Sequence, residues 1–89
     1  MTTDVRLESL RQQIDELDGQ LISLLAQRML LSRQIGLHKR QAGLPALQPQ
    51  RFSQLLQRLR EQAAQQQLSP DFVDALYQLI HQESLRCQQ

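Results

Sequence analysis

Leucine and isoleucine recur at alternating intervals of three and four residues through the first half of the chain, the spacing that places side chains on one face of an α-helix. This face is termed the seam, and its residues are Leu7, Leu10, Ile14, Leu17, Leu21, Leu24, Leu31 and Ile35. Glutamine repeats every seven residues on another face, at Gln13, Gln20, Gln27, Gln34 and Gln41, which marks the side turned to water. The pattern predicts one long helix over about residues 5–41, ended by Gly43 and Pro45.

Two shorter helices are predicted in the second half of the chain. Pro49 suits the first position of a helix, and apolar residues follow it at helical spacing, at Phe52, Leu55, Leu56, Leu59 and Ala63. They predict a helix over about residues 49–66. Ser69 as a cap and Pro70 at the first helical position predict a third helix over about residues 70–87. The predicted fold class is therefore all-α, with one long and two shorter helices in a single domain of residues 1–89.

The predicted long helix is too long for the other two to cover. A helix of about 37 residues extends about 55 Å, and each shorter helix reaches about half that length. A single small domain would leave much of the seam in water. We therefore expect an intertwined homodimer, in which two long helices pair and the shorter helices of both chains pack around them.

Arg28 occupies a seam position where a leucine would continue the pattern. Taking an unpaired guanidinium out of water costs on the order of several kcal/mol, so Arg28 needs a carboxylate partner or an acidic ligand. One interpretation is a polar seam residue that fixes the register of paired helices. The other interpretation is that Arg28 binds an anionic ligand.

Further cations on inward helix faces favour an anion site. Lys39 lies close to three full turns after Arg28, so the two side chains project from the same side of the helix. Arg51 lies one turn before an apolar position of the second helix. Arg11 borders the seam near the N-terminus, and an antiparallel partner helix would bring it towards Arg28 of the other chain.

The third helix adds a hydroxyl and an amide. Ser84 and Gln88 are four residues apart and follow its inward face, so their side chains stack in line. With hardly any acidic groups among these residues, the set predicts a receptor for a small dianion. Each residue also has a simpler interpretation: Lys39 and Arg40 as a solvated helix end, Ser84 bonded to a carbonyl of its own helix, and Gln88 frayed.

Composition excludes several classes of function. A net charge of +1 provides no broad basic surface, so nucleic acid is not an expected partner. No apolar stretch approaches the roughly 18 residues of a membrane span and no secretion signal is recognisable, so we expect a cytoplasmic protein that does not bind membranes. Cys87 has no partner for an internal disulfide, and neither His38 nor His81 has a second ligand at metal spacing. Both histidines are expected at the surface or at an edge, with no metal site and no agent for ordinary acid, base or nucleophilic chemistry.

Several segments resemble the all-helical chorismate mutases, and the resemblance covers essentially the whole chain without insertions. The segments that carry it are residues 10–18, 24–28 and 35–39, Arg51, and residues 84–89. The resemblance implies an isomerase of shikimate-derived aromatic biosynthesis. It also implies an intertwined dimer of three-helix chains with two active sites, each built from both protomers.

The resemblance assigns a role to each candidate residue. It implies that Arg28, Arg51 and Lys39 of one chain, with Arg11 of the other, hold the two carboxylates and the ether oxygen of the substrate. Ser84 would assist a carboxylate, and Gln88 would share the ether oxygen with Lys39, so Lys39, Gln88 and Arg28 are the expected catalytic residues. Chorismate rearranges to prephenate by an internal Claisen shift that requires no proton transfer and no covalent intermediate, so no cofactor is expected.

Two residues depart from the family pattern. Gln48 and Phe52 stand where that pattern has an aspartate and a glutamate facing the ring hydroxyl of the substrate. Phenylalanine cannot accept that hydrogen bond, and the loss would cost about 1 to 3 kcal/mol. Chorismate is therefore expected to be a poorer substrate than a ring-4-substituted analogue such as 4-amino-4-deoxychorismate. Two alternatives stay open: an isochorismate pyruvate lyase on the same fold, and a non-catalytic helical dimerisation module.

Overall fold

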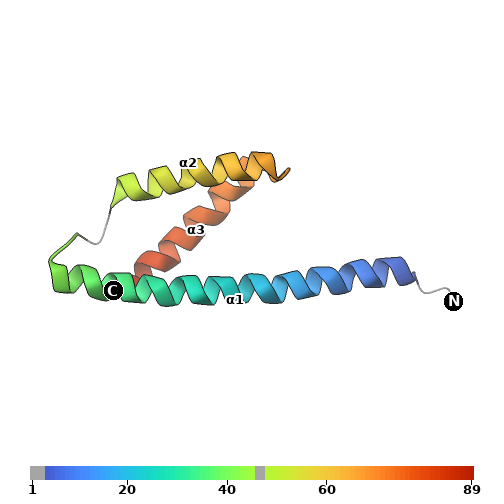
Figure 1. The fold of residues 1–89 in the computed structure, drawn as a ribbon, viewed down its shortest axis with the longest axis horizontal. Helices are drawn as coiled ribbons and strands as arrows, with labels where there is room; N and C mark the ends of the chain where they lie inside the picture. The colour runs from blue at the N-terminus through green and yellow to red at the C-terminus, as the bar shows by residue number, and fades with distance from the viewer. Residues whose placement is uncertain (1–3, 46–47) are drawn as a thin grey trace.

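The structure is a computed structural model that describes residues 4–45 and 48–89. Within these ranges the chain forms three α-helices and no strand: α1 (Val5–Ala42), α2 (Pro49–Gln65) and α3 (Pro70–Gln88) (Figure 1). The all-α prediction with one long and two shorter helices is confirmed. Each helix starts where predicted and ends within one residue of the predicted end, a difference typical of fraying helix termini. The predicted domain range of 1–89 includes residues 1–3 and 46–47, which lie outside the described residues.

Local capping sets where α1 and α3 begin and end. The Asp4 side chain accepts a hydrogen bond of 3.0 Å from the backbone N–H of Leu7, which satisfies one free donor at the start of α1. Gly43 follows α1 in the left-handed conformation with φ of 68°, as its predicted role as a helix terminator requires. Ser69 caps α3 through a hydrogen bond of 3.3 Å from the backbone N–H of Phe72.

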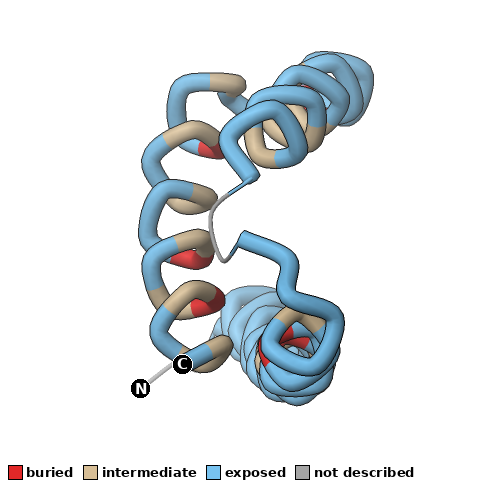
Figure 2. Tube along the Cα trace, turned by 90° about the vertical axis from the view of Figure 1, so that its left-hand side faces the viewer, coloured by how far each residue is buried: buried red, intermediate tan, exposed pale blue. Residues whose placement is uncertain are grey.

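The third helix joins the other two. In the described part of the chain α3 packs against α1 and against α2, whereas α1 and α2 do not pack on each other (Figure 1). The buried and half-buried positions of α3 face inward, toward the space that the other helices enclose (Figure 2). At the turn between α2 and α3, Arg60 forms salt bridges with Asp71 and Asp74. This arrangement leaves a space between α1 and α2 with α3 along one side.

A single chain has an elongated shape and a small core. Its radius of gyration is 17.5 Å, whereas a compact domain of this length would have a radius of about 12 Å. The buried apolar residues among those described are Ala63, Val73 and Ile80. The shape confirms the expectation that the two shorter helices leave much of α1 uncovered.

The seam of α1 is exposed along its whole length. Ile14 is 55% exposed, Leu17 61% and Leu24 60%, and the other seam residues are also exposed. Isolated exposed leucines are ordinary on protein surfaces, but a continuous apolar stripe marks an interaction surface. None of the three described helices is both long and apolar enough to cross a lipid bilayer.

Candidate functional site

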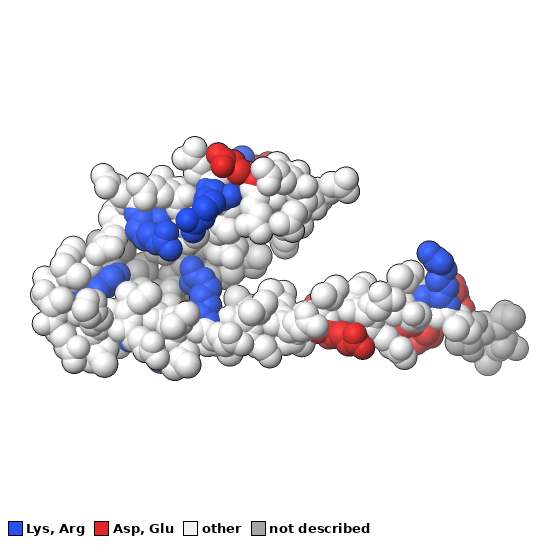
Figure 3. All heavy atoms as spheres, in the orientation of Figure 1, with Lys and Arg blue, Asp and Glu red and all other residues white. Residues whose placement is uncertain are grey.

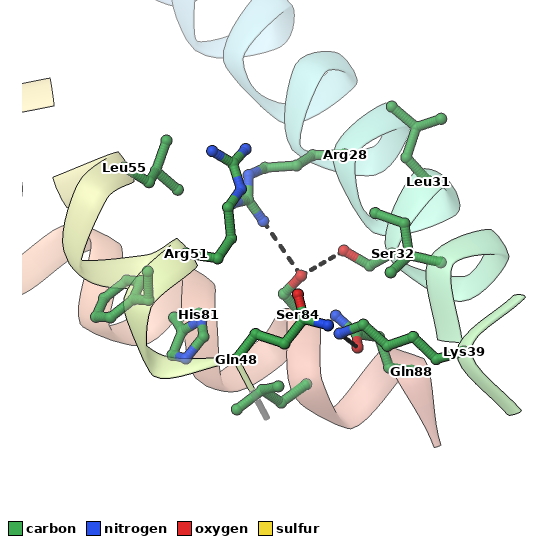
Figure 4. A pocket seen from close by; sticks show the side chains of 13 residues that line it. Arg28, Leu31, Ser32, Lys39, Gln48, Arg51, Leu55, His81, Ser84 and Gln88 are labelled. Atoms are coloured by element: carbon green, nitrogen blue, oxygen red, sulfur yellow. Dashed lines mark hydrogen bonds between the residues drawn. The ribbon is translucent and has the colours of Figure 1, made fainter. Parts of the chain in front are cut away.

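The three helices enclose a cavity of about 370 Å³, with α3 on one side and α1 and α2 on the others (Figure 4). Its lining combines basic, neutral polar and apolar side chains: Arg28, Leu31, Ser32, Ile35, Lys39, Gln48, Arg51, Phe52, Leu55, His81, Ser84, Leu85 and Gln88. Seven of the eight site residues predicted from the sequence are in this set. The volume is suited to a small metabolite.

The cavity is cationic. Arg28 and Lys39 reach it from α1 and Arg51 from α2, and none of the described lining residues is an aspartate or glutamate. Figure 3 shows Lys and Arg side chains gathered around the hollow between α1 and α2. Like charges held together in a partly dry site repel one another, and a bound anion relieves that repulsion. The site is therefore suited to a ligand with more than one negative charge.

Arg28 is held by neutral groups. It donates a hydrogen bond of 3.3 Å to the hydroxyl of Ser84, and its guanidinium lies 5.9 Å from the centre of the Tyr77 ring. It forms no salt bridge with any described carboxylate of its own chain. No described carboxylate of its own chain thus neutralises its charge, which is compatible with the ligand interpretation of this seam position.

Ser84 is also hydrogen-bonded to a second serine, Ser32. Ser32 and Ser84 are 3% and 6% exposed, and their hydroxyls share a hydrogen bond between α1 and α3 (Figure 4). Sequence reasoning missed Ser32, although it lies one helical turn after Arg28 and therefore on the same face of α1. The link from Arg28 through Ser84 to Ser32 fixes the guanidinium and the Ser84 hydroxyl relative to each other.

Lys39 and Gln88 meet at the other end of the cavity. The Lys39 ammonium donates a hydrogen bond of 2.9 Å to Oε1 of Gln88 (Figure 4). Because an ammonium has no acceptor, this contact orients the amide with its oxygen toward Lys39 and leaves the Nε2 hydrogens as donors to a ligand. Two donors of different charge are thus placed side by side.

Gly36 allows α3 to approach α1 at this end. A Cβ atom at residue 36 would lie 2.3 Å from the carbonyl oxygen and 2.5 Å from Cα of Gln88. The same carbonyl accepts a hydrogen bond from Arg40. The helical pattern of the sequence assigns no role to Gly36. The structure gives it the specific role of letting Gln88 reach Lys39.

We expect Gly36→Ala to lower both stability and activity, because the backbone of α3 must move to admit the methyl group. Overpacking of this kind costs about 1 to 3 kcal/mol in the free energy of unfolding, and displacement of Gln88 should lower kcat. Chemical denaturation and steady-state kinetics measure the two effects. Gly19→Ala is the matched control, because nothing lies within 4 Å of a Cβ there and alanine favours a helix by about 1 kcal/mol. Equal behaviour of the two variants would contradict the assigned role.

The position of His81 differs from the one expected from the sequence. It was placed at the surface or at an edge, but it is half-buried, lines the cavity and stacks on Phe52 with ring centres 3.9 Å apart and planes 13° apart. Its spacing of three residues from Ser84 on α3 could have shown that both lie on one face. Burial, followed by the nearby charges of Arg28 and then Lys39, lowers the pKa of His81 below its usual 6.5. The folded chain therefore favours the neutral imidazole, and this contribution to stability is lost as the pH falls below 6.5.

Arg11 lies far from the cavity of its own chain. It is exposed near the start of α1, where it pairs with Glu8 at 3.7 Å, and seventeen residues of helix separate it from Arg28, about 25 Å. Of the predicted site residues it is the one that a single chain does not bring to the cavity. In the described ranges no three His, Cys, Asp or Glu side chains form a group that could hold a metal ion.

Comparison with known proteins agrees with the helical architecture. A conserved hypothetical protein from Pyrococcus furiosus has a similar structure, with a TM-score of 0.78 and 29% sequence identity over 98% of this chain and 100% of that one. The 4-amino-4-deoxychorismate mutase of Streptomyces venezuelae is 35% identical over 86 residues, covering 97% of this chain and 84% of that protein.

Longer proteins also contain a similar segment. The T-protein of Haemophilus influenzae is 38% identical over 78 residues, which cover 88% of this chain but 21% of that protein. The chain thus spans about a fifth of the length of this relative. Residues 10–89 match the family described as chorismate mutase type II. Because that match extends over nearly the whole sequence and includes α2, α3 and most of α1, the chain belongs to the chorismate mutase type II family, a family of isomerases.

Proposed function

We propose that this chain catalyses the internal Claisen rearrangement of chorismate or of a ring-4-substituted analogue such as 4-amino-4-deoxychorismate. The observation that supports the proposal most strongly is a cavity lined by three cations and by no described carboxylate. A substrate with two carboxylates supplies the missing negative charge. The product would be prephenate or its 4-amino counterpart.

The proposed mechanism depends on orientation and electrostatics. Arg28 and Arg51 would hold the carboxylates, since a planar guanidinium can donate two hydrogen bonds to one carboxylate. This fixes the side chain of the substrate over its ring, so that the carbon atoms to be joined are close together. Ser84, which accepts a hydrogen bond from Arg28, would contact one of these carboxylates.

Lys39 and Gln88 would act on the ether oxygen. Negative charge develops there as the carbon–oxygen bond breaks, so an ammonium and an amide N–H aimed at this oxygen bind the transition state more tightly than the ground state. The hydrogen bond from Lys39 to Oε1 of Gln88 leaves the amide hydrogens for this purpose. No proton needs to move, which agrees with a site built from donors.

The complete site would require a second copy of the chain. An antiparallel partner helix packed on the exposed seam would remove its apolar side chains from water and bring Arg11 of one protomer to the cavity of the other. Arg11 would then close the cavity and provide another contact to a carboxylate. We therefore propose an intertwined homodimer with two shared active sites.

The identity of the ring substituent is the finer part of the proposal. Gln48 and Phe52 line the cavity in place of the two acidic residues of the family pattern, and a relative at 35% identity is a 4-amino-4-deoxychorismate mutase. In the family pattern the acidic residues contact the ring hydroxyl of the substrate, and an uncharged cavity wall disfavours this contact. The uncharged wall does not by itself select an amino substituent. The amino substrate is supported by the relative and by the altered wall together.

The test is incubation of the purified protein, separately, with chorismate, 4-amino-4-deoxychorismate and isochorismate. We expect prephenate from the first or its 4-amino counterpart from the second, with the higher kcat/KM for the amino substrate. Release of pyruvate and salicylate from isochorismate alone would instead identify a lyase on the same fold. Failure to convert any of the three would leave a helical dimerisation module.

A further inference from the structure

Most polar groups of the cavity are already engaged with one another. Arg28, Ser84 and Ser32 are linked in one set of hydrogen bonds, and Lys39 and Gln88 in another. Together with Arg51, these two sets contain the donors that the proposed function assigns to the carboxylates and the ether oxygen. The neutral polar groups of the cavity outside these sets are Gln48 and His81 (Figure 4).

His81 is the more precisely held of these two groups. It projects from the middle of α3 and is half-buried, whereas Gln48 is exposed and precedes the first turn of α2. The Phe52 ring lies nearly parallel to the imidazole at a centre-to-centre distance of 3.9 Å. Stacking covers one face of the imidazole and holds the plane of the ring, and the hydrogen bonds of the two nitrogen atoms lie in that plane.

The charge around His81 favours an imidazole that both donates and accepts. Arg28 and Lys39 on α1 and Arg51 on α2 line the same cavity, and none of its described lining residues on α3 is charged. Burial, followed by the nearby charges of Arg28 and Lys39 on α1, disfavours a positive charge on the ring. A neutral imidazole carries one N–H donor and one nitrogen acceptor. That pair matches a hydroxyl or amino substituent, which can itself donate and accept.

We propose that His81, held in place by Phe52, contacts the ring substituent of the substrate and determines which ring-substituted substrates this chain accepts. The inference rests on the proposed function, because it assumes a ring-bearing dianion whose carboxylates face the arginines. The assignment gives Phe52 a second role in the cavity. The phenylalanine removes an acceptor from the cavity wall and at the same time supports a different hydrogen-bonding group on α3.

The test is His81→Phe, which retains an aromatic ring to stack on Phe52 and removes both nitrogen atoms. For the better of the two mutase substrates, we expect kcat/KM to fall by about tenfold to a hundredfold, the effect of leaving one polar group without its partner. For the analogue with hydrogen in place of the ring-4 substituent, kcat/KM should change by less than about twofold, because no hydrogen bond is lost there. The measured quantity is the ratio of the two kcat/KM values.

Two further variants separate recognition from packing. His81→Gln retains a donor and an acceptor and should recover part of the lost ratio. Gln82→Phe places the same phenyl ring at the next, exposed position of α3 and should leave the ratio unchanged. Equal losses on both substrates in His81→Phe, or no loss on either, would overturn the assignment even though the wild-type chain is an active mutase. A wild-type chain that converts neither substrate would overturn the proposed function, and this inference with it.

Discussion

Replacing Lys39 by methionine is expected to lower kcat by about 100- to 1,000-fold, the effect of removing one donor aimed at a developing negative charge. Methionine retains an unbranched side chain of similar length, so the packing of α1 should be preserved. KM should change less than kcat, because the ammonium contributes most when the ether oxygen carries charge. Steady-state kinetics with the preferred substrate measures both parameters, and circular dichroism checks that the helices are intact.

Arg58→Met is the matched control for this substitution. It also removes one positive charge, but from an exposed position of α2 that does not line the cavity. We expect its kcat to remain close to that of the wild-type chain. If Lys39→Met and Arg58→Met had equal kcat values, Lys39 would have no part in the chemistry and the assigned mechanism would be wrong.

The helices were predictable because their signals are local. Asp4, Gly43, Ser69 and the prolines at the starts of α2 and α3 act through backbone groups within a few residues of themselves. The seam was predictable for a similar reason, since helical spacing alone determines which side chains share a face. Helix ends could be read to within one residue, as local capping rules allow.

Part of the cavity was predictable in the same way. Arg28 and Lys39 share a face of α1, and Ser84 and Gln88 share a face of α3, so spacing alone could pair them within each helix. Spacing could not show that these two faces meet. The resemblance to chorismate mutases provided that step, and the hydrogen bonds from Arg28 to Ser84 and from Lys39 to Gln88 agree with it.

Contacts between helices explain what sequence reasoning missed. Ser32 gains its role from Ser84, Gly36 from the backbone of Gln88, and His81 from the ring of Phe52. Each pair joins residues far apart in the sequence, and a small or polar side chain carries no local signal of its distant neighbour. The position of Arg11 in a site cannot be read from one chain at all, because the cavity that it is proposed to serve belongs to another protomer.

Crossed variants are expected to restore activity if the active sites are shared. Arg11→Ala and Lys39→Met should each be inactive as homodimers. When the two are unfolded together and refolded as a mixture, half of the dimers should contain one chain of each kind, and each of these has one site with both Lys39 and Arg11 intact. The mixture should therefore regain about a quarter of the wild-type activity, as random pairing in a two-fold dimer requires.

A second mixture tests whether the gain comes from sharing across the interface. Arg28 and Lys39 line the same cavity of one chain, so a mixture of Arg28→Ala and Lys39→Met leaves every site with one defect and should remain inactive. If the Arg11→Ala and Lys39→Met mixture also remained inactive although native mass spectrometry detected mixed dimers, Arg11 would not serve the partner's site. Recovery in the first mixture alone would mean that Arg11 of one chain serves the cavity of its partner, and that neither chain has a complete active site by itself.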